Sequence, residues 1–172
     1  MGTPGPGHVG LYVGTFDPVH HGHLDIVARA ARLFERVVVG VIDRPSKPLL
    51  FSQDERVALF RQAVDDLPSV TVEGYSGLTV DYARRVGAIA LVRGLRGAPD
   101  FEYEHQLTAM NRHLSPELET VFLITASARA HLSASLIKEV AAQGVDLTGL
   151  VPPHVAATLA RKLRPSPASG QE

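Results

Sequence analysis

Short apolar runs alternate with segments of helical periodicity along this 172-residue chain. In the runs, apolar residues follow one another closely and Val is frequent, a pattern typical of strands that are buried within a sheet. In the other segments, apolar residues recur every three or four positions, which indicates helices with one buried face. The runs predict strands at residues 9–13, 37–42, 70–75, 89–92 and 120–125.

Helices are predicted between and after these strands, at residues 22–34, 54–64, 78–86, 101–113, 133–143 and 152–163. Local signals support their ends: Ser52 and Glu55 form a capping box, Gly87 suits a helix C-cap, and Pro152 stands where a helix tolerates proline. Strands that alternate with helices predict an α/β fold, a doubly wound, five-stranded parallel sheet of Rossmann-like type. Because no repeat or linker is visible, we expect a single domain over residues 1–164 and a disordered, Pro- and Ser-containing tail over residues 165–172.

Composition narrows the function classes. The net charge is -1, which gives no broad basic face for nucleic acid, and the 45% hydrophobic content is ordinary for a globular protein. The chain has no cysteine, which excludes disulfides, thiolate chemistry and cysteine-ligated zinc. No signal peptide and no apolar run of membrane-spanning length are visible, so we expect a cytoplasmic location and neither a membrane nor a nucleic-acid partner.

The polar motifs follow predicted strands, and in a parallel sheet ligands bind beyond the carboxyl ends of the strands. The first motif, GTFDPVHHGH at residues 14–23, joins the first strand to the first helix. Gly14 permits a close approach of backbone and ligand, Thr15 offers a hydroxyl, and the helix start offers free N–H groups to an anion. His20 and His23 are three residues apart and can face the same phosphates. There are two alternatives to phosphate binding by these histidines. They could form a metal site, or they could be exposed residues of a turn.

Further motifs follow the other strands. Lys47 lies between prolines after the second strand, and Arg93 and Arg96 flank Gly94 after the fourth, a pattern that suits phosphate. The alternative for Lys47 is a solvated loop lysine, and the alternative for the two arginines is a surface salt-bridge pair. In the segment DFEYE and in the helix after it we interpret Tyr103, Glu104 and Asn111 as walls of a site. Ser133 and Ser135 begin a helix and suit either phosphate binding or ordinary N-capping.

GTFDP followed by HxGH resembles the signature of the HxGH nucleotidyltransferase superfamily. The blocks RGLR, DFEYE, MNRHL and GLTVDYA make the chain similar to the phosphopantetheine adenylyltransferase family in particular, from about Tyr12 to Leu163. The resemblance implies reversible transfer of the adenylyl group from ATP to 4′-phosphopantetheine, giving dephospho-CoA and pyrophosphate, with Mg²⁺ bound to ATP. It also implies a homohexamer, a dimer of trimers, and CoA as a feedback inhibitor.

The motifs and this resemblance together predict the site residues. The catalytic group is Thr15, His23, Lys47 and Arg96. The acceptor, phosphopantetheine, is expected to contact Thr15, Lys47, Leu78, Thr79, Arg93 and Asn111. ATP is expected to contact Gly14, Thr15, Phe16, His20, His23, Arg93, Gly94, Arg96, Tyr103, Glu104, Ser133 and Ser135. No metal ligand is expected from protein side chains.

The chain departs from the family pattern at Val13, where proline is usual, and at Ala134, where the family has the middle of three serines. The segment at residues 127–131 also differs, so the divergence falls mainly on the ATP side. Two alternative functions stay open at this point. One is another HxGH transferase, which would act on nicotinate mononucleotide or glycerol 3-phosphate, and the other is a non-catalytic nucleotide or CoA sensor.

Overall fold

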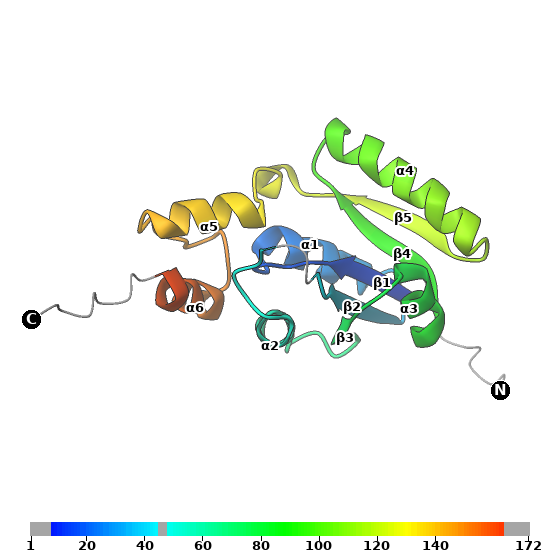
Figure 1. Ribbon diagram of the computed structural model, residues 1–172, viewed down its shortest axis with the longest axis horizontal. Coiled ribbons are helices and arrows are strands. Elements are labelled where there is room, and N and C mark those ends of the chain that lie inside the picture. The colour runs from blue at the N-terminus through cyan, green and yellow to red at the C-terminus, as the bar shows by residue number, and fades with distance from the viewer. Residues whose placement is uncertain (1–7, 45–47, 164–172) are drawn as a thin grey trace, which may run out of the picture.

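The structure is a computed structural model that describes residues 8–44 and 48–163. Its centre is a parallel sheet of five strands, in the order β3-β2-β1-β4-β5 (Figure 1). The strands are β1 (Val9–Gly14), β2 (Arg36–Ile42), β3 (Val70–Tyr75), β4 (Ala88–Leu95) and β5 (Glu119–Ile124). Strands β2 and β3 are added in turn on one side of β1, and β4 and β5 are then added on its other side. The predicted doubly wound sheet is confirmed, and its switch point lies between β1 and β4, where such folds bind ligands.

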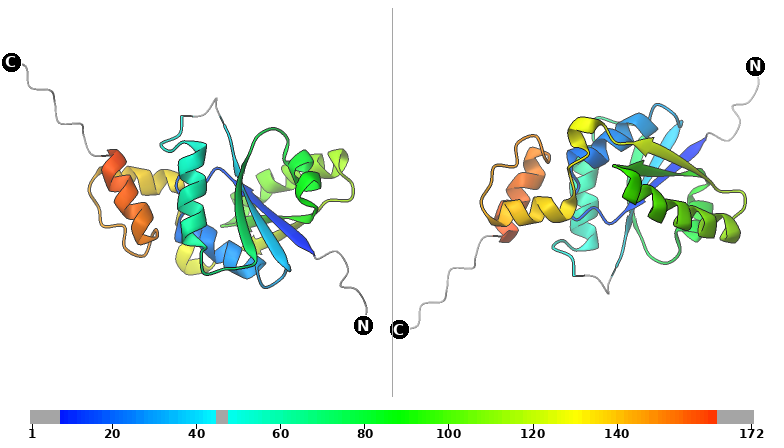
Figure 2. Two further views of the ribbon diagram at one scale, coloured as in Figure 1. Left: turned by 90° about the horizontal axis from the view of Figure 1, so that it is seen from below. Right: turned by 90° about the horizontal axis from the view of Figure 1, so that it is seen from above.

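Helices cover both faces of the sheet. Helices α1 (His21–Ala30) and α2 (Gln53–Ala63) lie on one face, whereas α3 (Thr79–Val86) and α4 (Ala98–Leu114) lie on the other (Figures 1 and 2). The 3-10 turn η1 (Ser127–Arg129) follows β5. Helices α5 (Ala134–Ala142) and α6 (Pro153–Leu163) pack against each other beyond the carboxyl ends of the strands. These two helices therefore extend the structure on the side where the site is expected.

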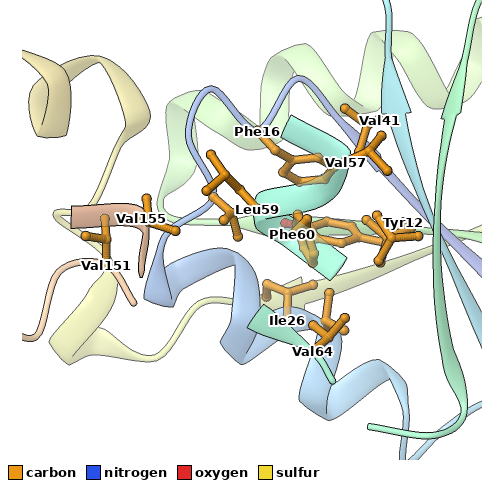
Figure 3. Packing of buried hydrophobic residues seen from close by; sticks show 14 of the residues in the cluster. Tyr12, Phe16, Ile26, Val41, Val57, Leu59, Phe60, Val64, Val151 and Val155 are labelled. Atoms are coloured by element: carbon orange, nitrogen blue, oxygen red, sulfur yellow. The ribbon is translucent and has the colours of Figure 1, made fainter. Parts of the chain in front are cut away.

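Alternate residues of β1 are buried on opposite faces of the sheet. Leu11 and Val13 join the core beneath α3, whereas Tyr12 joins the larger core beneath α1 and α2. Figure 3 shows the aromatic centre of this larger core, in which the Phe16 ring lies 4.7 Å from that of Phe60 and 5.3 Å from that of Tyr12. Burial on both faces explains why the sequence of β1 is almost continuously apolar.

Several element boundaries differ from the prediction. Strand β4 continues through Arg93 and Gly94 to Leu95, because these residues pair with β5, so the first three residues of the RGLR motif are strand rather than loop. Helix α1 ends at Ala30 and not at Phe34, although the Phe34 ring still packs over Gly10 of β1, where an added Cβ would meet it at 2.7 Å. The apolar period thus continues to Phe34, beyond the last residue of α1.

The capping signals read from the sequence are confirmed. Ser52 and Glu55 form a reciprocal capping box at α2, and Gly87 is the left-handed C-cap of α3, with φ of 70°. No helix in residues 8–44 or 48–163 is long and apolar enough to cross a membrane. Lys47 and the tail predicted at residues 165–172 lie outside the described residues.

Candidate active site

Two pockets adjoin at the carboxyl edge of the sheet. The first, of about 480 Å³, is enclosed by the loop after β1, the end of β4, the start of α4 and the segment that leads into α5. The second, of about 380 Å³, lies between the ends of β2 and β3, helix α4 and the same two strands β1 and β4. Both pockets are lined by Val13, Gly14, Thr15, Arg93, Tyr103 and Glu104. Thr15 and Arg93 therefore face two cavities at once.

The loop after β1 is shaped by Phe16, whose backbone is left-handed with φ of 51°. A bulky residue rarely adopts this conformation, and its cost is met here by burial, since the Phe16 ring is 3% exposed. The ring stands edge-on to His23 at 4.9 Å and so forms the floor beneath that imidazole. An added Cβ on Gly14 would lie 2.7 Å from the Phe16 ring, so this ring also explains the glycine at the end of β1.

His20 and His23 are fixed by backbone hydrogen bonds at the start of α1. The amide of Gly22 donates to His20 Nδ1 at 3.1 Å, and the amide of His20 donates to His23 Nδ1 at 3.2 Å. The two rings stack at 3.6 Å, and an added Cβ on Gly22 would meet the His20 ring at 2.9 Å. Because each Nδ1 accepts a hydrogen bond, a neutral ring carries its proton on Nε2, where it serves as a donor.

Both rings are held neutral near pH 7. Burial, the positive charge of Arg96 and the neighbouring His21 lower the pKa of His20 to about 4. Burial, together with His20 and Arg96, also lowers the pKa of His23 well below its ordinary value. His23 therefore offers a neutral N–H donor to the first pocket.

The expectation that the first turn of α1 presents free N–H groups is wrong. The amide of His21 donates to the carbonyl of Leu150 at 3.0 Å, that of Gly22 to His20, and that of His23 to the His20 carbonyl at 2.9 Å. These amides therefore bond to His20 and to the α5–α6 connection, and they are not available to an external anion. At this helix start, only the direction of the helix dipole still favours the binding of an anion.

Helix α5 presents its N-terminus to the first pocket instead. Ser133 is its N-cap, and the Ser133 hydroxyl accepts from the amide of Leu136 at 3.2 Å, which confirms the N-cap reading of this serine. The cap leaves the amides of Ala134 and Ser135 without a partner inside the helix. Ser133 and Ala134 line the first pocket, whereas Ser135 is exposed and lies outside its lining. The first turn of α5 thus combines amides, a hydroxyl and a dipole at one wall.

Arg93 is oriented by Glu104, whose side chain is buried. Arg93 Nε donates to Glu104 Oε2 at 2.7 Å, Nη2 donates to Glu104 Oε1, and Nη1 donates to the carbonyl of Val13 at 3.0 Å. Burial alone would lower the pKa of Arg93, but the bonds to Glu104 raise it above its ordinary value. A guanidinium has five N–H groups, so two remain for a ligand at the junction of the pockets.

Arg96 lines the first pocket and is paired with Asp100. Its Nε donates to Asp100 Oδ2 at 3.0 Å, and its Nη1 donates to the carbonyl of Leu132 at 3.4 Å. Gly94 and Tyr103 line the same pocket, and Tyr103 is largely exposed. Of the predicted ATP contacts, all but Ser135 line the first pocket: Gly14, Thr15, Phe16, His20, His23, Arg93, Gly94, Arg96, Tyr103, Glu104 and Ser133.

The second pocket contains some of the residues predicted to contact the acceptor. Thr79 and Asn111 line it, and the Thr79 hydroxyl lies 3.0 Å from that of Tyr75. Leu78 is 58% exposed and lies outside the lining. Lys47 belongs to the part of the chain that the structure leaves undescribed.

Metal ligands are not grouped in the described ranges, where no cluster of three or more His, Cys, Asp or Glu could hold an ion. The carboxylates of the first pocket, Asp100 and Glu104, already accept hydrogen bonds from Arg96 and Arg93. The alternative of a histidine metal site is therefore not supported. A metal ion that entered with a nucleotide would take its ligands mainly from phosphate and water.

Sequence reasoning missed several pocket residues. Arg44 and Tyr75 line the second pocket at the ends of β2 and β3, and Thr125 lines the first just after β5. The rule that ligands lie beyond strand ends could have identified these three. Arg129 of η1 also lines the first pocket, where its Nη1 donates to the His21 carbonyl at 3.1 Å and lies 3.7 Å from Asp25. No motif signalled Arg129, because its partners are about a hundred positions away in the chain.

The fold is shared with solved nucleotidyltransferases. A bifunctional NMN adenylyltransferase/ADP ribose pyrophosphatase from Francisella tularensis superposes with a TM-score of 0.68 at 16% identity, over 91% of this chain and 49% of that one. A putative nicotinate-nucleotide adenylyltransferase from Vibrio parahaemolyticus gives a TM-score of 0.64 at 16% identity, over 89% of this chain and 98% of that one. At this identity the likeness concerns the fold alone.

Sequence relatives are more informative. The phosphopantetheine adenylyltransferase of Thermomicrobium roseum is 53% identical over 160 residues, which cover 91% of this chain and 96% of the relative. The protein of the same name from Thiobacillus denitrificans is 52% identical over 154 residues, or 90% of this chain and 96% of the relative. A model of the cytidylyltransferase-like family matches residues 11–140. The chain therefore belongs to the cytidylyltransferase-like family and, within it, to the phosphopantetheine adenylyltransferases.

Proposed function

We propose that this protein transfers the adenylyl group of ATP reversibly to 4′-phosphopantetheine, giving dephospho-CoA and pyrophosphate in coenzyme A biosynthesis. The observation that carries the proposal is the meeting of two pockets at Thr15 and Arg93. A nucleotide in the first pocket and a phosphorylated acceptor in the second would bring their phosphates together there. The names of relatives at 50–53% identity support the choice of substrates.

ATP would lie in the first pocket with its triphosphate along charged and amide donors. The α-phosphate would face Thr15 and His23, at the floor formed by Phe16. The β- and γ-phosphates would reach the start of α5, where the amide of Ala134 and the capped end of the helix favour negative charge. Arg96, which lines the same pocket, adds a cation that can bind phosphate oxygens.

The reaction is a displacement at the α-phosphorus. An oxygen of the acceptor phosphate forms a bond to this phosphorus while the bond to the β-phosphate oxygen breaks, and pyrophosphate leaves. The acceptor phosphate is ionised at neutral pH, so the protein need not remove a proton from it. Repulsion between the two anions is the larger obstacle, and fixed donors and cations that offset it supply most of the catalysis.

His23 and Arg93 divide this task. The neutral His23 ring donates its Nε2–H to an α-phosphate oxygen as negative charge develops there, and it needs no change of protonation during the cycle. Arg93, aligned by Glu104, keeps two N–H groups for phosphate oxygens at the junction of the pockets. Lys47 would add a second cation on the acceptor side, where Thr79 and Asn111 line the pocket.

Mg²⁺ would enter with ATP and neutralise part of the charge on the triphosphate. Asp100 and Glu104 are already engaged by arginines, so phosphate oxygens and water are the ligands that we expect for the ion. The same family likeness leads us to propose a single domain over residues 1–164, a homohexamer, a cytoplasmic location and inhibition by CoA.

The decisive experiment measures pyrophosphate release by the purified protein with ATP, Mg²⁺ and 4′-phosphopantetheine, with the nucleotide product identified by mass. Dephospho-CoA in the full mixture, and none without the acceptor, supports the proposal. Parallel reactions contain nicotinate mononucleotide or glycerol 3-phosphate as acceptor, and CTP in place of ATP. Preference for one of these would replace the proposal with another transferase activity. Binding of ATP or CoA in calorimetry without any product would favour the sensor.

A further inference from the structure

A buried arginine lies behind the junction of the two pockets. Arg56 of α2 is 1% exposed and directs its guanidinium at carbonyl groups rather than at a carboxylate. Its Nη1 donates to the carbonyl of Thr15 at 2.6 Å and to that of Ile42 at 3.0 Å, and its Nε donates to that of Phe51 at 3.2 Å. One side chain thus joins the loop after β1, the end of β2 and the start of α2.

Asp17, in the loop after β1, also holds the segment that precedes α2. Its carboxylate is 3% exposed and accepts from the amides of Leu50 at 3.0 Å and Phe51 at 2.9 Å. It also forms an ion pair with Lys138 of α5 at 2.6 Å. Burial would raise the pKa of Asp17, but the bonds from Lys138, Leu50 and Phe51 lower it below its ordinary value, so it stays ionised. Phe51 is consequently held at its N–H by Asp17 and at its carbonyl by Arg56.

These contacts bracket the segment that carries Lys47. Ile42 ends β2, and Phe51 immediately precedes Ser52, the N-cap of α2, so the two carbonyls held by Arg56 stand on either side of residues 43–50. The third carbonyl belongs to Thr15, which lines both pockets. Arg56 therefore connects the residue expected at the α-phosphate with both ends of the segment expected at the acceptor phosphate.

The choice of arginine points to positioning rather than to stability. Burying a cation is costly, and an apolar residue at such a site is often as stabilising or more so. Burial lowers the pKa of Arg56, which the charges of Asp17 and Asp43 offset in part. A guanidinium differs from an ammonium because its rigid planar fork can bond several acceptors in fixed directions at once. Three carbonyls from three segments make use of that property.

We propose that Arg56 is a positioning residue for adenylyl transfer: it sets the Thr15 peptide at the junction of the pockets and fixes both ends of the segment that carries Lys47. It touches neither substrate. The inference rests on the proposed function and adds to it a residue outside the lining of either pocket.

The test compares Arg56→Lys with a matched control, Arg61→Lys. Arg61 lies on the same helix and also donates to a backbone carbonyl, that of Val72 in β3 at 2.8 Å, but it is remote from both pockets. For Arg56→Lys we expect kcat to fall about 10- to 100-fold, the effect of a small misplacement of reacting groups. The KM for 4′-phosphopantetheine should rise more than the KM for ATP, because ATP also has Arg96, His23 and the start of α5, which do not contact Arg56. Arg61→Lys should leave all three constants near those of the unsubstituted protein.

Hydrogen exchange measured by mass spectrometry adds a readout that does not need activity. In Arg56→Lys the amides of residues 14–17 and 49–51 should exchange faster, while those of β3 keep their protection. In Arg61→Lys the amides of β3 should exchange faster, while those of residues 14–17 and 49–51 keep their protection. If both variants share the same kinetic constants and the same exchange at residues 14–17 and 49–51, Arg56 is only structural and the inference is overturned. If the unsubstituted protein forms no dephospho-CoA, the proposed function is refuted. The exchange data would still decide whether Arg56 positions these segments.

A second variant covers the case in which Arg56→Lys does not fold. Asp17→Asn keeps the size of the side chain but replaces one carboxylate oxygen by an NH₂ group, so the side chain can accept from only one of the amides of residues 50 and 51 and has no charge to pair with Lys138. It should shift kcat and the acceptor KM in the same direction as Arg56→Lys and speed amide exchange at residues 49–51. Unchanged constants and exchange in a folded Asp17→Asn protein would contradict the inference.

Discussion

Acidification should weaken this fold through His20. The pKa of His20 is lowered from 6.5 to about 4 in the folded protein, first by burial and then by Arg96 and His21. In the unfolded chain the ring returns to its ordinary pKa of about 6.5, so between these two values the unfolded state binds a proton that the folded state does not. The associated stability is fully present above the unfolded pKa and is lost as the pH falls towards the folded one.

The magnitude follows from the size of the shift. One pKa unit corresponds to about 1.4 kcal/mol, so His20 alone would remove about 3 kcal/mol from the free energy of unfolding once the pH is below about 4. Between about pH 7.5 and about pH 5.5 the same relation gives a loss of about 1 kcal/mol. The lowered pKa of His23 acts in the same direction.

The assay is urea unfolding followed by circular dichroism at several pH values, for the unsubstituted protein and for His20→Asn. Asparagine is a favourable N-cap that can accept the Gly22 amide, but it does not titrate in this range. One protein concentration is used throughout, because association would stabilise both proteins by mass action. The unsubstituted protein should lose about 1 kcal/mol more than His20→Asn between about pH 7.5 and about pH 5.5.

Equal pH dependence of the two proteins would refute the reasoning. It would mean that the folded protein accepts a proton on His20 as readily as the unfolded chain does. The geometry in which Nδ1 accepts the Gly22 amide would then not persist in solution, and the neutral state inferred for its neighbour His23 would lose its support. A kcat profile that titrates near the ordinary histidine pKa would point the same way.

Three further substitutions test the proposed roles. His23→Ala should lower kcat by about 100-fold or more while the circular dichroism spectrum is unchanged, because it removes a donor to the developing charge; near-normal turnover would exclude that role. Glu104→Gln should raise the KM of both substrates by about ten-fold, because Arg93 loses its charged anchor at the junction; steady-state kinetics with each substrate varied would detect this, and unchanged KM values would show that Arg93 needs no such partner. Lys47→Ala should raise the acceptor KM by about ten-fold and leave the ATP KM nearly unchanged, and an unaltered acceptor KM would remove Lys47 from that site.

Local patterns predicted those features of the fold that depend on near neighbours. The alternation of apolar runs and helical periods predicted five parallel strands in the right places, because a strand buried on both faces must be apolar along most of its length. Capping at Ser52 and Gly87 was predicted because caps bond within a few residues. The end of β4 was missed, because Arg93 and Gly94 become strand only by pairing with β5.

The candidate site was only partly predictable for the same reason. Placing the motifs beyond strand ends gathered most of the residues named from the sequence around two pockets. The first turn of α1 was misjudged, because histidine caps and the carbonyl of Leu150, far along the chain, use its amides. Ser135 and Leu78 carry motif-like sequence but lie outside the pocket linings, since the direction of a side chain depends on how its helix packs.

The sequence by itself determined the fold class, the family and the edge of the sheet at which the chemistry would lie, because period, turn residues and motifs act over a few positions. Only the tertiary structure decided which groups form ion pairs and hydrogen bonds with each other. Arg56 reaches Thr15 across 41 positions, and Lys138 reaches Asp17 across 121. No local pattern encodes such pairs, since burial and the directions of donors and acceptors arise only when the segments pack together.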